Sequence, residues 1–434
     1  MSINVFHRYH IRFFEYMYMV VMVIYMAQMT SETSRMMGTI SGNPIPLLLP
    51  ILLTIVLITR KRIRWNNIGL LALLLVLLIW SVLILVKYQA FGSTEDLSYI
   101  FFLFYAVIIA FIHVKVYGKQ LLPIYEHIMV WICGISLVFW LLNVIFYRSL
   151  SPSFFPETTS GYNVLYLYNW IIPEKAFSDV FAIMLRNSGC SWEAGRFAIM
   201  VNLALYSNLL RNGIKFRNNY SVWILLAALF STQSTTGFIS GLVLYTVFTF
   251  SRINFKSIMI LICLLIPLWF GISRLDFMQK KISEQLDFEN SISEMYDSFS
   301  YTQFNLADNE YAGSLGRFES FYFDIQNMLH DPVLGYSRNR MHSSFYSNIS
   351  SNFFLTGGLA KIFAQYGILL ALILFSILGF SSAQLADDFH STQKVALFLI
   401  ILISAVSYEI WCVPIFTAVW LYGLFNKKIA KIRR

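Results

Sequence analysis

The chain has few charged residues and lacks the short motifs that identify nucleotide-, dinucleotide- or zinc-dependent enzymes. Asp, Glu, Lys and Arg make up 13% of its 434 residues, hydrophobic residues make up 57%, and the mean hydropathy is +0.63. A soluble protein of this length does not need so much apolar surface, so the composition indicates a protein that sits in the lipid bilayer. No Walker motif, G-x-G-x-x-G, H-E-x-x-H or D-x-D sequence occurs, which argues against the chemistry those motifs perform.

Cysteine is also scarce. Cys133, Cys190, Cys263 and Cys412 are scattered, with no C-x-x-C spacing. We interpret them as small hydrophobic residues in or near apolar segments, which indicate neither a metal site nor a redox compartment. No A-x-A-like cleavage site follows the first apolar stretch, so we expect that stretch to be retained as a span. We expect no metal and no other cofactor.

Apolar runs fill most of the chain and predict an all-α polytopic membrane protein with about twelve transmembrane helices. The predicted spans are residues 13–29, 45–59, 68–86, 97–114, 126–147, 193–210, 220–233, 237–250, 257–272, 362–380, 395–408 and 411–425. Residues 1–272 then form a transmembrane bundle with an outer loop at 148–192. Residues 273–361 form a large, partly helical loop, and residues 362–434 form the last three spans and a basic tail.

The basic residues predict the orientation of these spans. If both termini are cytoplasmic, the inside segments carry 19 of the 32 lysines and arginines, as the positive-inside rule requires. The loops at 148–192 and 273–361 then lie outside. Because the basic residues sort by membrane side, the net charge of +9 does not indicate a nucleic-acid partner.

A first group of candidate site residues precedes and opens the sixth span. It contains Arg186, Trp192, Glu193 and Arg196. One interpretation is that the arginines reach for lipid headgroups at the interface. The other is a cationic site at the outer surface, in which Glu193 compensates Arg196, because an unpaired cation inside a span costs about 2.5–3.5 kcal/mol. Trp192 fits an interfacial position and a sugar platform equally well.

A second group lies in the large outer loop. Arg317 follows a glycine and opens a predicted helix that ends at His330, before Asp331-Pro332. Arg338, Arg340 and His342 then lie within five residues and are either a solvated basic turn or a receptor for diphosphate. His342 is either a bystander or a general base.

Two further features are polar groups among the spans. The run from Ser231 to Gly237 separates two short spans and is either a tight outside turn or the lining of a polar pocket. Glu15 and Glu409 are ionisable residues at the ends of spans, where such groups suggest a function.

In their order along the chain, these motifs resemble bacterial O-antigen polymerases of the Wzy type and the related O-antigen ligases. The resemblance covers roughly residues 180–380 and rests on R-x-x-G at 186–189, W-E-x-G at 192–195, the Ser/Thr-Thr-Gly run at 234–237, G-R at 316–317, P-x-L-G at 332–335 and A-Q-Y-G-I-L at 364–369. It implies a GT-C-like architecture and a reaction at the outer face of the bacterial inner membrane on sugars carried by undecaprenyl diphosphate. The family's essential arginines would correspond to Arg186 and Arg317. The ligase histidine usually lies nearer the next span than His342 does.

The resemblance implies a metal- and nucleotide-independent glycosyltransferase that polymerises lipid-linked oligosaccharide repeat units of O-antigen or of capsular or exopolysaccharide. Arg186 and Arg317 would bind the diphosphates, Arg196, Arg338, Arg340 and Trp192 would contact substrate, and His342 or Glu193 would be the base. An O-antigen ligase that uses lipid A-core as acceptor, or a flippase of the same lipid, are the alternatives. A chain-length regulator and a flippase are the expected protein partners.

Overall fold

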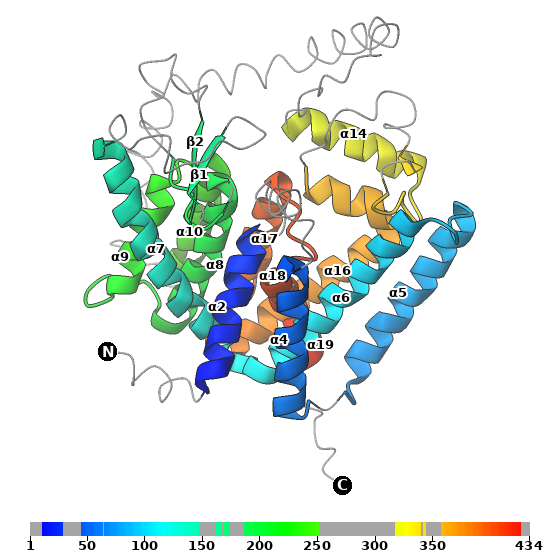
Figure 1. Ribbon diagram of the computed structural model, residues 1–434, viewed down its shortest axis with the longest axis horizontal. Coiled ribbons are helices and arrows are strands. Elements are labelled where there is room, and N and C mark those ends of the chain that lie inside the picture. Colours follow the sequence, from blue (N-terminus) through cyan, green and yellow to red (C-terminus); the bar gives the residue numbers. More distant parts are fainter. Residues whose placement is uncertain are drawn as a thin grey trace, which may run out of the picture.

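The described part of the chain is a bundle of α-helices with one small β-hairpin (Figure 1). The computed structural model describes residues 11–28, 45–63, 65–146, 162–165, 168–173, 186–191, 193–250, 317–339, 342–343 and 357–426. Its helices are α2 (Phe13–Gln28), α4 (Ile45–Lys61), α5 (Ile68–Lys87), α6 (Thr94–Tyr117), η1 (Gly118–Gln120), α7 (Leu121–Phe146), α8 (Ala194–Asn212), α9 (Tyr220–Ser231), α10 (Thr235–Phe250), α14 (Arg317–His330), α16 (Leu359–Asp388), α17 (Ala396–Ser407), α18 (Pro414–Trp420) and α19 (Tyr422–Asn426).

The helices coincide with the predicted spans wherever the chain is described. Eleven predicted spans overlap helices, and the predicted span at 257–272 lies outside the described residues. The last span is broken at Leu421 into α18 and α19, and the helix predicted in the large loop is α14. The membrane bundle is therefore helical, as the composition indicated.

The described part of the outer loop at 148–192 adds one short hairpin to the helical fold. There, β1 (Tyr162–Leu165) and β2 (Tyr168–Pro173) form an antiparallel hairpin in which Tyr162 pairs with Pro173 and Leu165 with Tyr168. The two strands are short and rich in aromatic and β-branched residues, which favour extended structure over helix.

Polar side chains pair at two opposite ends of the bundle. At the first, which we call the basic end, the pairs are Glu15–Lys61 (2.7 Å), Glu126–Arg211 (2.6 Å) and Lys119–Asp388 (3.4 Å). The second end lies below α14 in Figure 1, and we call it the α14 end. The basic end also holds the described parts of the basic loops that were predicted to share one side of the membrane. These loops lie within residues 60–67, 115–125, 211–219 and 381–394. The bundle helices from α2 to α10 therefore alternate in direction, and so do α16, α17 and the broken helix α18–α19.

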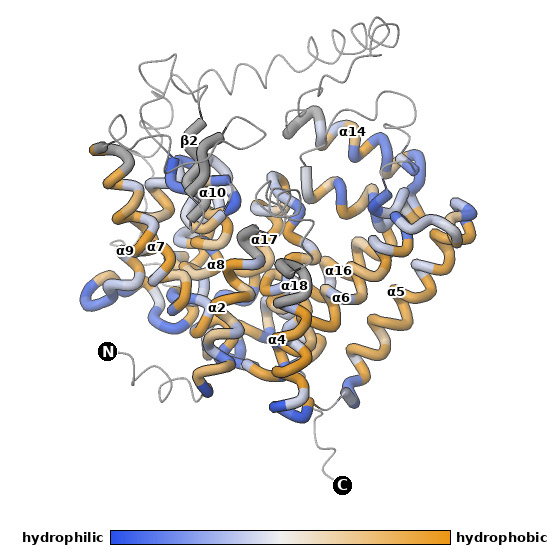
Figure 2. Tube along the Cα trace, in the orientation of Figure 1, coloured by the Kyte–Doolittle hydropathy of each residue, from blue (hydrophilic) through white to orange (hydrophobic). Residues whose placement is uncertain are grey.

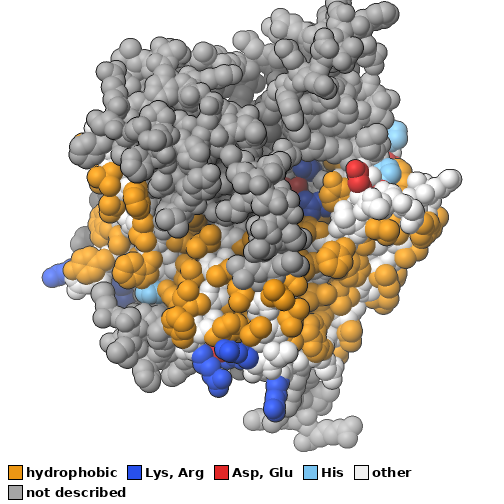
Figure 3. Space-filling model, viewed as in Figure 1, with side chains coloured by type: hydrophobic (Ala, Val, Ile, Leu, Met, Phe, Trp, Pro, Cys, Tyr) orange, Lys and Arg blue, Asp and Glu red, His pale blue; other side chains and the backbone are white. Residues whose placement is uncertain are grey.

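The outer surface of the bundle is apolar enough to face lipid. Three described helical stretches are long and apolar enough to cross a membrane: Ile68–Lys87, Thr94–Leu142 and Leu359–Asp388. Leucine, isoleucine and valine side chains cover the exposed face of α5, at the edge of the bundle, and include Ile68, Leu71, Leu75, Leu78, Ile79, Val82 and Val86. Figure 2 shows hydrophobic helices with hydrophilic ends, and Figure 3 shows the same apolar band in space-filling form. The chain is a helical membrane protein.

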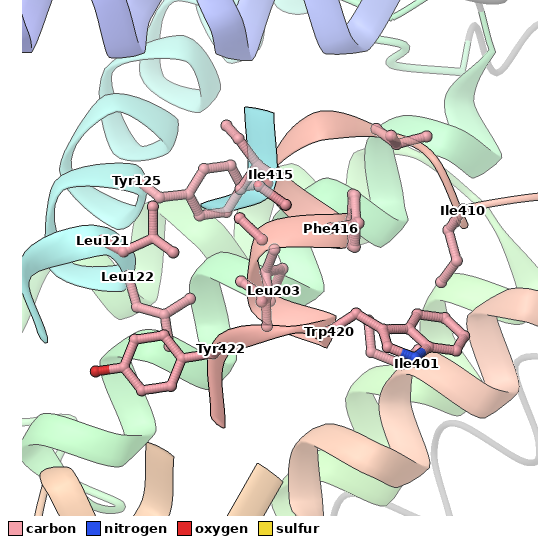
Figure 4. Packing of buried hydrophobic residues seen from close by; sticks show 14 of the residues in the cluster. Leu121, Leu122, Tyr125, Leu203, Ile401, Ile410, Ile415, Phe416, Trp420 and Tyr422 are labelled. Atoms are coloured by element: carbon pink, nitrogen blue, oxygen red, sulfur yellow. The ribbon is translucent and has the colours of Figure 1, made fainter. Parts of the chain in front are cut away.

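The core lies where α7, α8, α17 and α18 meet, and large aromatic side chains fill it (Figure 4). Tyr125 and Trp420 are fully buried, yet each has a partner for its polar atom. Tyr125 donates its hydroxyl to the Met200 carbonyl (2.9 Å), and Trp420 donates Nε1–H to the Leu374 carbonyl (2.7 Å). Such bonds offset the cost of burying these groups and fix the helices against one another.

Helix α16 is interrupted at Gly367, where the loop that follows α14 packs against it. We call this segment, residues 331–339 and 342–343, the post-α14 loop. Three backbone hydrogen bonds join the two segments: Ile368 N–H to the Pro332 carbonyl (2.8 Å), Tyr336 N–H to the Ala364 carbonyl (3.0 Å) and Ser337 N–H to the Gln365 carbonyl (2.9 Å). Gly335 and Gly367 have φ of +71° and +73°, and an added Cβ would lie 2.5 Å and 2.1 Å from backbone oxygens of the other segment. Both positions therefore require glycine.

Candidate functional site

The α14 end holds a cluster of charged side chains around Glu409, in the link between α17 and α18. Arg338 Nη2 lies 2.8 Å from one carboxylate oxygen of Glu409, and Lys361 Nζ lies 3.1 Å from the other. The three side chains are mostly buried, at 16–21% exposed. Arg338 comes from the post-α14 loop and Lys361 from the first turn of α16, so three distant segments of the chain meet here.

The electrostatics of the cluster follow from this packing. Burial alone would raise the pKa of Glu409, but Arg338 and Lys361 outweigh burial and lower it to about 2. Burial alone would lower the pKa of Arg338, and the Glu409 carboxylate outweighs that effect and raises it. Nη1 of Arg338 is buried and makes no hydrogen bond to the residues that the structure describes. A guanidinium donor buried in this way costs free energy unless an acceptor, such as an oxyanion, reaches it.

Arg196, in the first turn of α8, adds a third cation. It is buried, and the charges of Glu193 and Glu409 both act on it. We call Arg196, Arg338 and Lys361, together with Glu409, the cation cluster. In Figure 3, acidic and basic side chains lie together above the hydrophobic band, on the side of α14.

Glu193 has a contact in addition to the charge interaction with Arg196 that the sequence suggested. It precedes α8 in an extended conformation, so it does not share a helical face with Arg196. Its Oε1 accepts a hydrogen bond of 2.5 Å from the Tyr408 hydroxyl. Tyr408 directly precedes Glu409, so this bond joins the start of α8 to the cation cluster.

Arg186 lies against the turn between α9 and α10. Its Nε donates to the Thr232 carbonyl (3.1 Å), and the neighbouring Asn187 donates to the Ser231 hydroxyl (2.9 Å). The hydroxyls of Thr236, at the start of α10, and Ser407, at the end of α17, are 2.6 Å apart. The polar run at 231–237 is therefore a tight turn that also connects Arg186 to the segment carrying Glu409.

His342 contacts Asp96, in the first turn of α6, through its imidazole. The two side chains are 2.9 Å apart, from Nε2 to Oδ1, and Asn339 donates to the other Asp96 oxygen at 2.8 Å. The Tyr88 ring stacks on the imidazole at a centroid distance of 3.9 Å and an angle of 13°. Asp96 is 1% exposed, whereas the His342 side chain is 15% exposed. A buried carboxylate thus holds a histidine that retains access to solvent.

The post-α14 loop is fixed to the helices on both sides. Asp331 accepts from Lys87 (2.5 Å) and from the Tyr88 hydroxyl (2.9 Å), both at the end of α5. The Arg338 guanidinium lies over the rings of Phe102 and Tyr99 on α6, 5.5 Å and 6.0 Å from their centroids. These contacts hold Arg338 against the same helix that carries Asp96.

Asp324, on the inner face of α14, is the most unusual buried group of the site. It is 0% exposed, and both carboxylate oxygens are buried without a hydrogen bond. Burial raises its pKa to about 7, Lys361 lowers it and Glu409 raises it further. Asp324 therefore titrates near neutral pH beside the cation cluster.

The structure brings most of the predicted site residues to one end of the bundle. Arg186, Glu193, Arg196, Arg338 and His342 all lie at the α14 end, linked by the contacts above. Arg317 is the first residue of α14, but the structure does not describe its side chain. Trp192 and Arg340 lie outside the described residues. Sequence reasoning missed Asp96, Asp324, Lys361 and Tyr408.

Two of the missed residues, Asp96 and Asp324, have an ordinary local explanation in the sequence. Asp96 belongs to a Ser-Thr-Glu-Asp helix start, where an acidic residue is expected whether or not it has a function. Asp324 is one of several polar residues of an amphipathic helix. The one usable signal was Lys361, a lone cation near the start of a long apolar span.

No protein-family model matches this chain, and no curated protein sequence matches it. Within the described ranges, no group of three or more His, Cys, Asp and Glu side chains could hold a metal ion. The geometry of the α14 end is therefore the main indication of function.

Proposed function

We propose that this chain is a glycosyltransferase that polymerises undecaprenyl-diphosphate-linked oligosaccharide repeat units at the periplasmic face of the bacterial inner membrane. The observation that carries the proposal is the cation cluster. Arg196, Arg338 and Lys361 come from distant segments and gather around Glu409 at one end of a membrane bundle, where a lipid-linked diphosphate would present its phosphates. Guanidinium groups bind phosphate oxygens bidentately, which suits this ligand.

The chemistry requires positive charge at one place and a proton acceptor nearby. A hydroxyl of the acceptor sugar attacks the anomeric carbon of the donor, and undecaprenyl diphosphate leaves. Negative charge grows on the diphosphate, and preorganised cations stabilise it without having to reorganise. Arg186 and Arg317 bind the diphosphates in this proposal, with Arg338 and Arg196 as further phosphate or sugar contacts.

His342 is the better candidate for the base. Its imidazole is partly exposed and oriented by a carboxylate, which is the arrangement of a general base. Glu193, the other candidate, already accepts a short hydrogen bond from Tyr408 on one of its two carboxylate oxygens.

The proposed placement puts both termini in the cytoplasm, about twelve spans in the membrane in a GT-C-like arrangement, and the α14 end in the periplasm. Leu329, on the exposed face of α14, and His390, in an exposed turn at the basic end, test it. In a background without the four cysteines, the Cys of Leu329→Cys should react with an impermeant thiol reagent in intact spheroplasts. The Cys of His390→Cys should react only after the membrane is permeabilised. The reverse pattern would show that the topology is opposite to the proposed one.

The decisive experiment is reconstitution. The purified protein, given only undecaprenyl-diphosphate-linked repeat units, should form polymer and release undecaprenyl diphosphate, without nucleotide, ATP or added metal. Product that appears only when lipid A-core is supplied would identify a ligase. Movement of the lipid across a vesicle membrane with no new glycosidic bond would identify a transporter.

Variants connect that activity to the α14 end. Arg186→Ala and Arg317→Ala should abolish polymer at normal protein levels, and Arg→Lys should restore little, because an ammonium group cannot make a bidentate phosphate contact. Arg217→Ala, at an exposed position at the basic end, is the matched control and should form full-length chains. Full-length chains from the Arg186 or Arg317 variant would remove that residue from the site.

A further inference from the structure

Asp96 contacts two residues of the segment that carries His342 through its carboxylate. It lies in the first turn of α6, about 240 residues earlier in the chain, and is 1% exposed. One carboxylate oxygen meets His342 Nε2 and the other accepts from Asn339. Its backbone N–H donates to the Ser93 hydroxyl, which fixes the start of the helix. The carboxylate is therefore held rigidly before any substrate arrives.

Asp96 lies in the first turn of α6, at the positive end of the helix dipole. A carboxylate in the first turn of a helix interacts favourably with the helix dipole and with the free N–H groups there. An ionised carboxylate accepts hydrogen bonds and cannot donate them. Because Asp96 faces Nε2, the imidazole proton must be on Nε2, and Nδ1 is then the nitrogen with an available lone pair.

We propose that Asp96 is a positioning residue that holds His342 in the tautomer with its proton on Nε2, so that Nδ1 accepts the proton of the attacking sugar hydroxyl. This inference rests on the proposed glycosyl transfer. Tyr88 stacks on the ring and prevents it from tilting, so carboxylate and ring together fix the direction in which Nδ1 points.

The step balances as follows. The O–H bond of the acceptor hydroxyl breaks, its proton goes to Nδ1, and its oxygen forms a bond to the anomeric carbon. The bond from that carbon to the diphosphate oxygen breaks, and its electron pair leaves with undecaprenyl diphosphate. The imidazolium then carries protons on both nitrogens, its charge is compensated by Asp96, and it returns the Nδ1 proton to solvent.

A purely structural role for Asp96 is the competing explanation, because the same carboxylate also ties the post-α14 loop to α6. The two roles differ in how substitutions combine. If Asp96 acts only through His342, replacing Asp96 has no further effect once His342 is gone. If Asp96 only supports the fold, the two losses multiply.

The test is steady-state kinetics on the full-length protein in nanodiscs with undecaprenyl-diphosphate-linked repeat units. We expect Asp96→Asn and His342→Ala each to lower kcat by about 10²-fold or more, the range of general-base catalysis, with little change in KM. The double variant should be no slower than His342→Ala alone. Lys394→Met, which breaks an exposed ion pair with Asp387 at the basic end, should keep kcat within a few-fold of wild type.

The outcomes separate cleanly. Wild-type kcat in Asp96→Asn, or a double variant slower than His342→Ala by the full factor of Asp96→Asn, would overturn the positioning role. Polymer formation at the wild-type rate by His342→Ala would overturn it as well, yet leave the polymerase proposal intact. If the wild-type protein forms no polymer from these lipids, the proposed function fails and this inference fails with it.

A second measurement does not depend on activity or on the folding of a variant at Asp96. In protein labelled with ¹⁵N-histidine, the His342 signals are those missing from His342→Ala. They should show a proton on Nε2 and none on Nδ1 in the resting protein. A resting imidazole with its proton on Nδ1 would contradict the proposal.

Discussion

Replacing Glu409 by glutamine should destabilise the protein by an amount that the cation cluster allows us to calculate. Arg338 and Lys361 lower the Glu409 pKa from its ordinary 4.5 to about 2, despite burial, which acts in the opposite direction. At 1.36 kcal/mol per pKa unit, that difference corresponds to about 3 kcal/mol of stability at neutral pH. The value is in the range expected for removing one partner of a buried ion pair.

The pH dependence has a definite sign. Because the pKa of Glu409 is lower in the folded protein, its contribution is fully present above pH 4.5 and is lost as the pH falls toward 2. Glu409→Gln has no carboxylate at this position, so it lacks that contribution at every pH. The difference in stability between wild type and variant should therefore be largest at neutral pH and shrink steadily below pH 4.5.

The assay is thermal unfolding of the purified protein in detergent, followed by tryptophan fluorescence over a series of pH values. We expect Glu409→Gln to lower Tm by several degrees at pH 7. Asp387→Asn is the matched control, because Asp387 also pairs with a lysine, Lys394 at 2.9 Å, but both side chains are more than half exposed. Such exposed pairs contribute at most about 1 kcal/mol. Equal Tm values for the Glu409 variant and wild type at pH 7 would refute the calculation.

Three further substitutions test other parts of the α14 end. Since burial raises the pKa of Asp324 to about 7, wild type should lose stability on the order of 4 kcal/mol as the pH rises from about 4 to 8. Asp324→Asn lacks the carboxyl group and should not show this loss. A Tm that falls as much in Asp324→Asn as in wild type over that pH range would contradict the prediction. Gly367→Ala places a Cβ 2.1 Å from a loop carbonyl and should lower Tm, whereas Gly134→Ala, with open space around it, should not. Tyr408→Phe removes the hydrogen bond to Glu193 and should cost about 1.5–3 kcal/mol in the same assay, so an unchanged Tm would show that the bond contributes nothing.

The sequence predicted the helices well because membrane spans are long apolar runs. Each run can be recognised from consecutive residues alone, without knowledge of the rest of the chain. It did not predict the contacts of the site, because those join segments that are far apart in the chain. His342 illustrates the difference: its residue type suggested a base, but only the structure places the Asp96 carboxylate against it. Glu193 was predicted in part, since its charge acts on Arg196 as the sequence suggested, but it lies outside the helix and also accepts a hydrogen bond from Tyr408.

The hairpin at 162–173 was missed for a different reason. In a chain dominated by apolar helices, two short strands in a loop give a signal of only a few residues. Tyrosine, tryptophan and isoleucine are also common at membrane interfaces, so their presence there had another explanation.

The backbone bonds between the post-α14 loop and α16 make the length of the loop part of the site. Pro332, Tyr336 and Ser337 are each paired with a fixed residue of the broken helix, so the chain between them can gain or lose no residue without losing a pairing. One added residue spans up to about 3.5 Å, more than the 2.8 Å that separates Arg338 from Glu409. The number of residues in the post-α14 loop therefore determines the distances between the charged groups at the α14 end. A deletion in this loop that removes no charged side chain would disrupt the Arg338–Glu409 pair as surely as replacing Arg338.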